Sequence, residues 1–246
     1  MTGKLSLPPL YEPVTLPATL ADAPTYALKL AVSGAQAGTF VWGDRDDMLD
    51  CALVLRPEIS AAEVRPVILV AALALSDAIG SVAEGAVPSE LIWPGEIRLN
   101  RGTVAGVSLD LADTEDDSQT PSWAVTSVSV RIAGRPGEEG GERMDQTSLR
   151  QEGLGDITSR ILAEAFGRYF LSWMDQWENG GLAPIAKNWM DRATSTGKDV
   201  VMMIRGELIA GSVEGLDESG GLVLETSQGR RVFDLADALS AGSEVR

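Results

Sequence analysis

The sequence predicts an α+β fold in which helices cover a mixed or antiparallel sheet, followed by a small carboxy-terminal β-barrel of the SH3-like kind. Up to about residue 194, helical and strand-like patterns alternate along the chain. After Ser195 the apolar residues recur with a period of two, in short segments separated by glycines. The 246 residues, 44% of them apolar, suffice for one large core and one small one. We therefore expect one domain over residues 1–194 and a second over residues 195–246.

The amino-terminal elements follow from local signals. Residues 1–19 are rich in proline and should run over the surface as extended chain. A helix is expected over 23–32, where apolar residues share one face and Pro24 suits the first turn. The stretch SGAQAGTFVWG, residues 33–43, predicts a glycine-punctuated loop that enters a strand. The apolar run 49–55 ends before a proline and predicts a buried strand.

The clearest helix is expected over residues 60–79. Ser60 is a favourable N-cap, and Glu63 completes a capping box three residues later. Gly80 suits the position after the last helical turn. Apolar residues cover most of the circumference of this segment, so we expect it to pack against a sheet.

Strands dominate the middle of the chain. Residues 90–97 and 103–111 predict two strands joined by a three-residue turn, Asn100-Arg101-Gly102. The acidic run 113–117 should be a solvated loop, since no other metal ligands lie near it in sequence. Residues 123–132 (WAVTSVSVRI) alternate in polarity and predict a further strand.

Two helices and a set of short strands are expected in the remainder. Residues 133–142 should form a loop or be disordered. Residues 156–178 predict a long amphipathic helix with an aromatic stripe in the core, ended by Gly180-Gly181, and 183–193 predict a shorter one. Beyond them, VVMMIRGEL, AGSVEGLD and GGLVLETSQGRRVFDL predict the strands of the small barrel.

Composition excludes several classes of function. A net charge of −16 opposes binding to nucleic acid or to an anionic membrane. The absence of histidine excludes Ser-His and Cys-His nucleophile pairs and histidine-ligated metals. Cys51, the single cysteine, falls in a predicted buried strand and should be inert. The amino terminus lacks a signal-peptide pattern and the apolar run 67–75 is short for a membrane span, so we expect a soluble cytoplasmic protein.

Three short motifs recur in a recognisable order. Ala35-Gln36-Ala37-Gly38 follows the first predicted helix, Trp93-Pro94-Gly95-Glu96 ends a strand, and Thr103-Val104-Ala105-Gly106 follows the turn. The carboxy-terminal ELIAGSVEGLDESGGLVLETSQGRRVF adds a glycine turn and a D-x-x-G turn before an apolar strand. With these motifs the sequence resembles the biotin/lipoate A/B protein ligase family, in particular biotin protein ligases with a class II synthetase-like core and an SH3-like carboxy-terminal domain.

The resemblance implies a reaction and a set of ligand-binding positions. Such ligases join biotin, lipoate or octanoate to ATP as an acyl-adenylate, with Mg²⁺ where ATP is used, and pass the acyl group to a lysine of a carrier domain. It implies no metal ligands within the chain. The ligand-binding positions that it implies are Gln36, Ala37, Gly38, Thr39, Trp42, Trp93, Glu96, Thr103, Ala105 and Gly106.

The charged residues of the family pattern are replaced in this sequence. Thr103 stands where the family has a lysine, and residues 39–43 (TFVWG) stand where it has an arginine-rich loop. Residues 23–25 (APT) replace a Ser-Thr-Asn pattern, and residues 127–131 (SVSVR) replace a glycine-rich strand that ends in asparagine. Losing one preorganised donor typically costs about 3–4 kcal/mol of transition-state stabilisation. The resemblance therefore assigns no catalytic residue, and Arg101 on the turn is the candidate substitute for the lysine.

Three functions remain open from the sequence. The chain is an enzyme with a rearranged site, or a non-catalytic relative that binds a small acyl or vitamin-like ligand or docks a carrier domain, or an interaction domain whose apolar loop is simply packed. The apolar loop 39–42 favours an uncharged or hydrophobic ligand over an adenylate, and Trp93 is compatible with a packing role. Regulation of DNA is not expected, because 19 proline-rich residues cannot form a helix-turn-helix. Pairing of edge strands would permit a homodimer.

Overall fold

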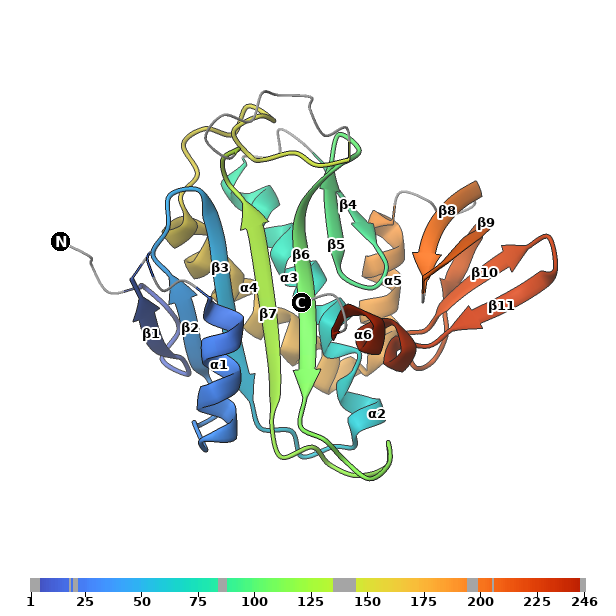
Figure 1. Cartoon of the computed structure of the whole chain (residues 1–246), viewed down its shortest axis with the longest axis horizontal. Coiled ribbons are helices and arrows are strands. Elements are labelled where there is room, and N and C mark those ends of the chain that lie inside the picture. Colours follow the sequence, from blue (N-terminus) through green and yellow to red (C-terminus); the bar gives the residue numbers. More distant parts are fainter. Residues whose placement is uncertain are drawn as a thin grey trace.

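The computed structural model of the chain is built around a seven-stranded sheet (Figure 1). It describes residues 5–17, 19, 22–83, 88–134, 145–193, 199–204 and 206–243. In spatial order the strands are β1 (Glu12–Leu16), β2 (Thr39–Gly43), β3 (Met48–Leu55), β7 (Ala124–Arg131), β6 (Gly102–Leu111), β5 (Glu96–Leu99) and β4 (Ser89–Ile92). β1 runs parallel to β2, and all other neighbouring strands of this sheet are antiparallel. The sheet is therefore mixed, and the predicted α+β class is confirmed.

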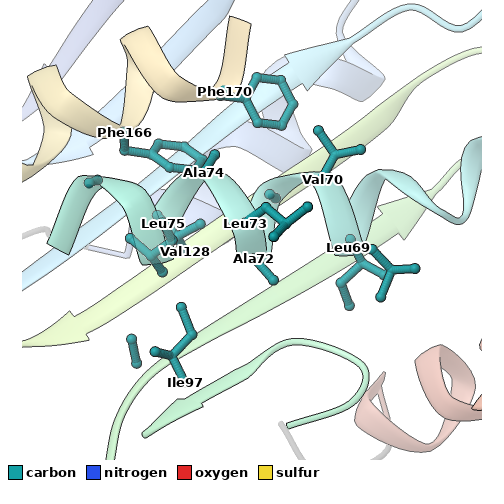
Figure 2. Packing of buried hydrophobic residues seen from close by; sticks show 14 of the residues in the cluster. Leu69, Val70, Ala72, Leu73, Ala74, Leu75, Ile97, Val128, Phe166 and Phe170 are labelled. Atoms are coloured by element: carbon teal, nitrogen blue, oxygen red, sulfur yellow. The ribbon is translucent and has the colours of Figure 1, made fainter. Parts of the chain in front are cut away.

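One face of the sheet is covered by two layers of helix. α3 (Val67–Val82) lies on the sheet, and α4 (Ser159–Gly180) packs over α3. Figure 2 shows α3 with Phe166 and Phe170 of α4 on one side and Val128 and Ile97 of the sheet on the other. Nearly every side chain of α3 is buried, which explains the apolar circumference seen in the sequence. The aromatic stripe of α4 lies in the core as predicted.

The predicted helix over residues 60–79 is in fact two helices. α2 (Ala61–Val64) carries the predicted capping box, and α3 begins after Pro66. A proline inside a helix lacks the N–H of the regular ladder, so it ends one helix and begins the next. α3 also continues past Gly80 to Val82. By length and composition alone the stretch Ala61–Val82 could cross a membrane, but 78% of its apolar window is buried inside the protein, as in a core helix.

The opposite face of the sheet is covered only in part. α1 (Ala23–Val32), whose bounds match the prediction, packs its alanine face against β2, β3 and Val125 of β7. Side chains alternate between the faces of a strand, so residues of the same parity as Val125 share this face. On β7 these are Ser127, Ser129 and Arg131, and their register partners on β6 include Ser108 and Gly106. The part of the face beside α1 is thus lined by small polar residues.

Two turns shape the edge of the sheet differently from the prediction. The strand expected over 90–97 is two strands, β4 and β5, which fold back on one another at Trp93-Pro94-Gly95; the Trp93–Pro94 bond is cis. The next turn has two residues rather than three, because Asn100 and Arg101 both have positive φ and Gly102 already belongs to β6. This is the geometry of a tight hairpin turn.

The carboxy-terminal part forms a second antiparallel sheet. Its strands are β11 (Gly229–Phe233), β10 (Leu222–Thr226), β9 (Glu207–Leu216) and β8 (Asp199–Ile204), in that spatial order. Among the described residues no pairing joins β8 to β11, so closure into a barrel stays a prediction. The predicted domain boundary at 194/195 lies outside the described residues.

Three further elements complete the chain. α5 (Leu182–Arg192) follows α4 and occupies the place of the second predicted helix. β1 and α6 (Leu235–Ser243) were not predicted. α6 follows β11 and contacts β6, in front of the large sheet and on the same side as α1 (Figure 1).

Candidate ligand-binding site

A cavity of about 510 Å³ lies over β6 and β7, between the β4–β5 turn and α6. Its lining comes from segments far apart in the sequence, from Met48 on β3 to Leu239 on α6. Its polar lining consists of Glu96, Thr103, Ser108, Asp110, Ser129, Arg131 and Gln146, and its apolar lining includes Met48, Ile68, Leu109, Ala238 and Leu239. A concave, mixed surface of this size suits a small molecule with one charged end.

A smaller cavity of about 250 Å³ adjoins the first. It reaches Pro24 at the start of α1, and it shares Gly106, Val107, Ser108 and Ser129 with the larger cavity. Ser127 also lines it, and the Ser127 hydroxyl is buried with no hydrogen-bond partner among the described residues. The two cavities together follow the sheet from α1 to α6.

The hairpin residues singled out in the sequence line the larger cavity. Glu96, Thr103, Ala105 and Gly106 all contribute to it. Thr103 Oγ1 donates to Glu96 Oε1 at 2.8 Å, and Arg98 Nε donates to the same oxygen at 2.5 Å. The position of the missing lysine is therefore occupied by a hydroxyl bound to a carboxylate. A Cβ atom built on Gly106 would meet nothing closer than Ser129 Oγ at 3.9 Å, so this glycine leaves the cavity open.

The residues singled out in the loop after α1 lie elsewhere. Gln36, Ala37, Gly38, Thr39 and Trp42 line neither cavity. A Cβ atom on Gly38 would lie 2.2 Å from the backbone oxygen of Leu10, so this turn is packed against the amino-terminal segment. Thr39 Oγ1 donates to the Gln36 carbonyl oxygen.

Both tryptophans of the predicted set are held by protein contacts. Trp42 is fully buried, donates from Nε1 to Thr15 Oγ1 at 3.0 Å and carries the Arg160 guanidinium over its ring. Trp93 is also buried, and its Nε1 donates to the Gly220 carbonyl oxygen at 3.0 Å. Neither tryptophan lines a cavity, so the structure gives both a packing environment.

Among the described residues the cation in the lining of the cavity is Arg131, which the sequence analysis did not select. Arg131 Nη2 donates to Gln146 Oε1 at 2.7 Å, and both residues line the larger cavity. Arg101, the predicted substitute for the lysine, is exposed at the hairpin turn and lines neither cavity. The sequence did hold a signal for Arg131, because in SVSVR it follows Ser127 and Ser129 at intervals of two residues. In a strand all three side chains lie on the same face.

Other reactive groups of the chain are engaged elsewhere. Arg45 follows β2 and forms an ion pair with Asp47, and its hydrogen bonds lower the pKa of the Asp47 carboxyl. Cys51 is fully buried in β3, and burial raises the pKa of its thiol, which keeps it protonated and unreactive. Within the described ranges, no three acidic or cysteine side chains gather as a metal site.

Similarity to known proteins places this fold and cavity in a family. Residues 7–191 match the sequence model of the Biotin/lipoate A/B protein ligase family. The chain is 30% identical over 193 residues to the biotin--[acetyl-CoA-carboxylase] ligase of Paracoccus denitrificans, covering 77% of this chain and 79% of that ligase. The chain therefore belongs to the biotin/lipoate A/B protein ligase family.

Solved structures agree with this assignment. A biotin protein ligase-like protein of unknown function from Silicibacter sp. TM1040 matches with a TM-score of 0.84 and 28% identity, covering 96% of this chain and 99% of that one. The biotin protein ligase of Aquifex aeolicus in complex with biotin and ATP shares the fold, with a TM-score of 0.72 and 18% identity, covering 92% of this chain and 97% of that one. The chain spans about three fifths or less of the length of the bifunctional ligase/repressors that it also matches.

Proposed function

We propose that the chain binds a carboxylate-bearing acyl or vitamin-like ligand in the joined cavities and transfers it to a carrier-protein lysine. Biotin, lipoate and octanoate are the ligands, and ATP is the activating substrate, with Mg²⁺ as the partner of its phosphates. The observation that carries the proposal is the cavity of about 510 Å³ lined by Glu96, Thr103, Ala105 and Gly106. These are the hairpin positions at which the family resemblance places the ligand.

The reaction consists of two displacements. A carboxylate oxygen of the ligand attacks the α-phosphorus of ATP, and pyrophosphate leaves with the electron pair of the broken P–O bond. The amine of the carrier lysine then attacks the acyl carbonyl carbon, loses a proton and expels AMP. Both steps develop negative charge on phosphate and carbonyl oxygens, so the site must provide positive charge and exclude competing water.

The chain contributes shape and an apolar wall to this chemistry. The smaller cavity, lined by Pro24 and by serines of β6 and β7, suits the end of the ligand remote from its carboxylate. Leu109, Ala238 and Leu239 line the larger cavity and shield an acyl-adenylate from water. Because Gly106 has no side chain, the ligand has room to lie against β6.

A second candidate function is binding without transfer, including the docking of a carrier domain that already bears its group. The observation that favours it is the acidity of the larger cavity, where Glu96 and Asp110 both lie in the lining. Carboxylates in the lining repel a triphosphate, although Arg98 pairs with Glu96 and offsets part of that charge. The partially buried position of the cavity weakens screening by solvent.

The decisive experiment joins calorimetry with mass spectrometry. Biotin, lipoate, octanoate and ATP are titrated separately into the purified protein, and a carrier domain is then incubated with the protein, each acid and Mg-ATP. An ATP-dependent increase in carrier mass equal to one acyl group supports transfer. Acid binding without ATP binding and without a mass increase supports the second candidate, and no binding of any acid or of the acylated carrier domain overturns both. Reactions without ATP are the control.

The proposal also bears on location and assembly. Carrier lysines are modified where carriers are made, so we place the chain in the cytoplasm, without a nucleic-acid or membrane partner. A homodimer formed through edge strands stays a prediction, which light scattering of the purified protein tests.

A further inference from the structure

We infer that Arg131, oriented by Gln146, is the residue that binds the carboxylate of the ligand and then the phosphate joined to it. This inference rests on the proposed function and names the charged group of the same site. An anionic reacting centre requires a cation within contact distance, and the site lacks the hairpin lysine, since Thr103 holds that position.

The composition of the lining leads to Arg131. Among the described residues that line the two cavities, Arg131 is the one with a positive side chain. The other arginines near the hairpin are placed differently. Arg98 donates to Glu96, and Arg101 is exposed on the turn. Within the described part of the chain, Arg131 is therefore the positive charge that a ligand in the cavity can meet.

The backbone around Arg131 is held firmly. Arg131 is the last residue of β7 and pairs with Met48 on β3. Its carbonyl oxygen accepts a hydrogen bond from the backbone N–H of Leu149 at 3.0 Å, and the Leu149 side chain is fully buried. This hydrogen-bonded backbone fixes the Cα atom from which the Arg131 side chain extends. The side chain therefore loses less conformational entropy when a ligand binds.

Gln146 orients the guanidinium beside Thr103. Gln146 forms an isolated β-bridge with Thr103, flanked by hydrogen bonds of 2.9 Å from Thr103 N to the Asp145 carbonyl and from Thr147 N to the Thr103 carbonyl. The Gln146 amide oxygen accepts from Arg131 Nη2 at 2.7 Å. A positive charge thus reaches the cavity that the hairpin lines from β7, held by a segment that is bridged to the hairpin.

The chemistry of arginine suits this role. Its planar guanidinium binds both oxygens of a carboxylate at once and remains charged at any physiological pH. After attack on ATP the same N–H groups face an oxygen of the acyl phosphate, so one side chain serves the ligand before and after activation. Gln146 is a positioning residue, because it acts on the ligand through Arg131.

The test compares each acid with its neutral methyl ester by calorimetry, using biotin, lipoate and octanoate as probes. The wild type should bind its preferred acid at least about tenfold more tightly than the ester, as expected for a charged hydrogen-bonded pair. Arg131→Ala should bring the acid-to-ester ratio close to one while ester affinity stays unchanged. Arg131→Lys should restore part of the ratio, and Gln146→Ala should lower it by a smaller factor. Unchanged ester affinity shows that the variant is folded.

Arg101→Ala is the matched control, since Arg101 is an arginine of the neighbouring turn that lines neither cavity; it should keep the wild-type ratio. A wild-type ratio in Arg131→Ala, or its loss in Arg101→Ala instead, overturns the inference and leaves the proposed function standing. Equal binding of acid and ester by the wild type also overturns the inference alone. Failure of the wild type to bind any of the acids overturns both.

Discussion

Two glycines of the family motifs, Gly38 and Gly106, stand in opposite environments. Gly38 has a φ of +87°, and a Cβ atom there would lie 2.2 Å from the Leu10 carbonyl oxygen. Gly106 faces open space, with Ser129 Oγ at 3.9 Å as the nearest atom. The first glycine is required by the packing of the chain on itself, and the second keeps a cavity free. A glycine of the family motifs therefore serves the packing of the fold at Gly38 and the shape of the cavity at Gly106.

This difference explains how the site departs from the family pattern. The loop after α1 retains its Gln-x-Gly letters because β2 and the amino-terminal segment need a tight turn there. The side chains of Gln36 and Ala37 are exposed and line neither cavity. The hairpin retains its Ala-Gly letters beside the cavity and has exchanged its lysine for Thr103. A motif that has lost its charges can thus persist for packing alone.

The largest effect is expected from Gly38→Ala. Strain at positive φ and the clash with the Leu10 backbone should lower the free energy of unfolding by about 3 kcal/mol or more, measured by urea denaturation. Gly34→Ala is the matched control, since Gly34 has a φ of +89° but nothing within 4 Å, and it should cost only about 1 kcal/mol. Equal losses in the two variants would show that the close approach to Leu10 contributes nothing.

An intermediate effect is expected from Trp93→Phe. The substitution removes the Nε1–H that binds the Gly220 carbonyl oxygen and leaves that buried oxygen unpaired, which should lower the free energy of unfolding by about 1–3 kcal/mol. Affinity for the preferred acid should stay within about twofold, because Trp93 lines neither cavity. A large loss of affinity with unchanged stability would assign Trp93 to the site instead.

Gly106→Val should act on binding rather than on folding. The new side chain occupies the open space above β6, so affinity for the preferred acid should fall at least about tenfold, or about 1.4 kcal/mol. The free energy of unfolding should change by less than about 1 kcal/mol, since a branched residue suits a strand. Calorimetry and urea denaturation of one preparation test both statements, and a loss of stability comparable to that of Gly38→Ala would remove the contrast between the two glycines.

The smallest effect is expected at Asp117, which lines neither cavity. Hydrogen bonding to Arg65 lowers the pKa of the Asp117 carboxyl below its ordinary value of 3.8. A depressed folded-state pKa contributes stability above the unfolded-state value and loses it as pH falls through the folded-state value. Because the Asp117 side chain is 61% exposed and solvent screens its charge, Asp117→Asn should cost less than about 1 kcal/mol at pH 7 and nothing well below pH 3.8. Denaturation curves at the two pH values test this.

Local patterns predicted most elements of the fold, and contacts between distant segments account for what they missed. The bounds of α1 follow from its apolar face, and β3, β7 and the aromatic core of α4 follow from period and length. The break at Pro66 was visible in the sequence and was outweighed by an uninterrupted apolar pattern. The pattern Leu235, Ala238, Leu239 likewise carried a helical signal for α6.

The sequence predicted the hairpin residues of the candidate site but not Arg131. The four hairpin residues fall in the cavity because they are close together in the chain. The packing of Gly38 depends on Leu10, and the place of Arg131 depends on the register of β7 against β6 and β3 and on the distant Gln146. No local pattern encodes which strand becomes the neighbour of which, so these assignments required the structure.

The wall that α6 provides has a consequence for how this family can diversify. Ala238 and Leu239 complete a cavity whose floor comes from the ligase core, and Trp93 binds the turn between β9 and β10. A lineage that exchanged or reshaped its carboxy-terminal unit would also remodel this cavity. Ligand preference in such proteins can therefore drift through residues that no alignment of the hairpin would flag.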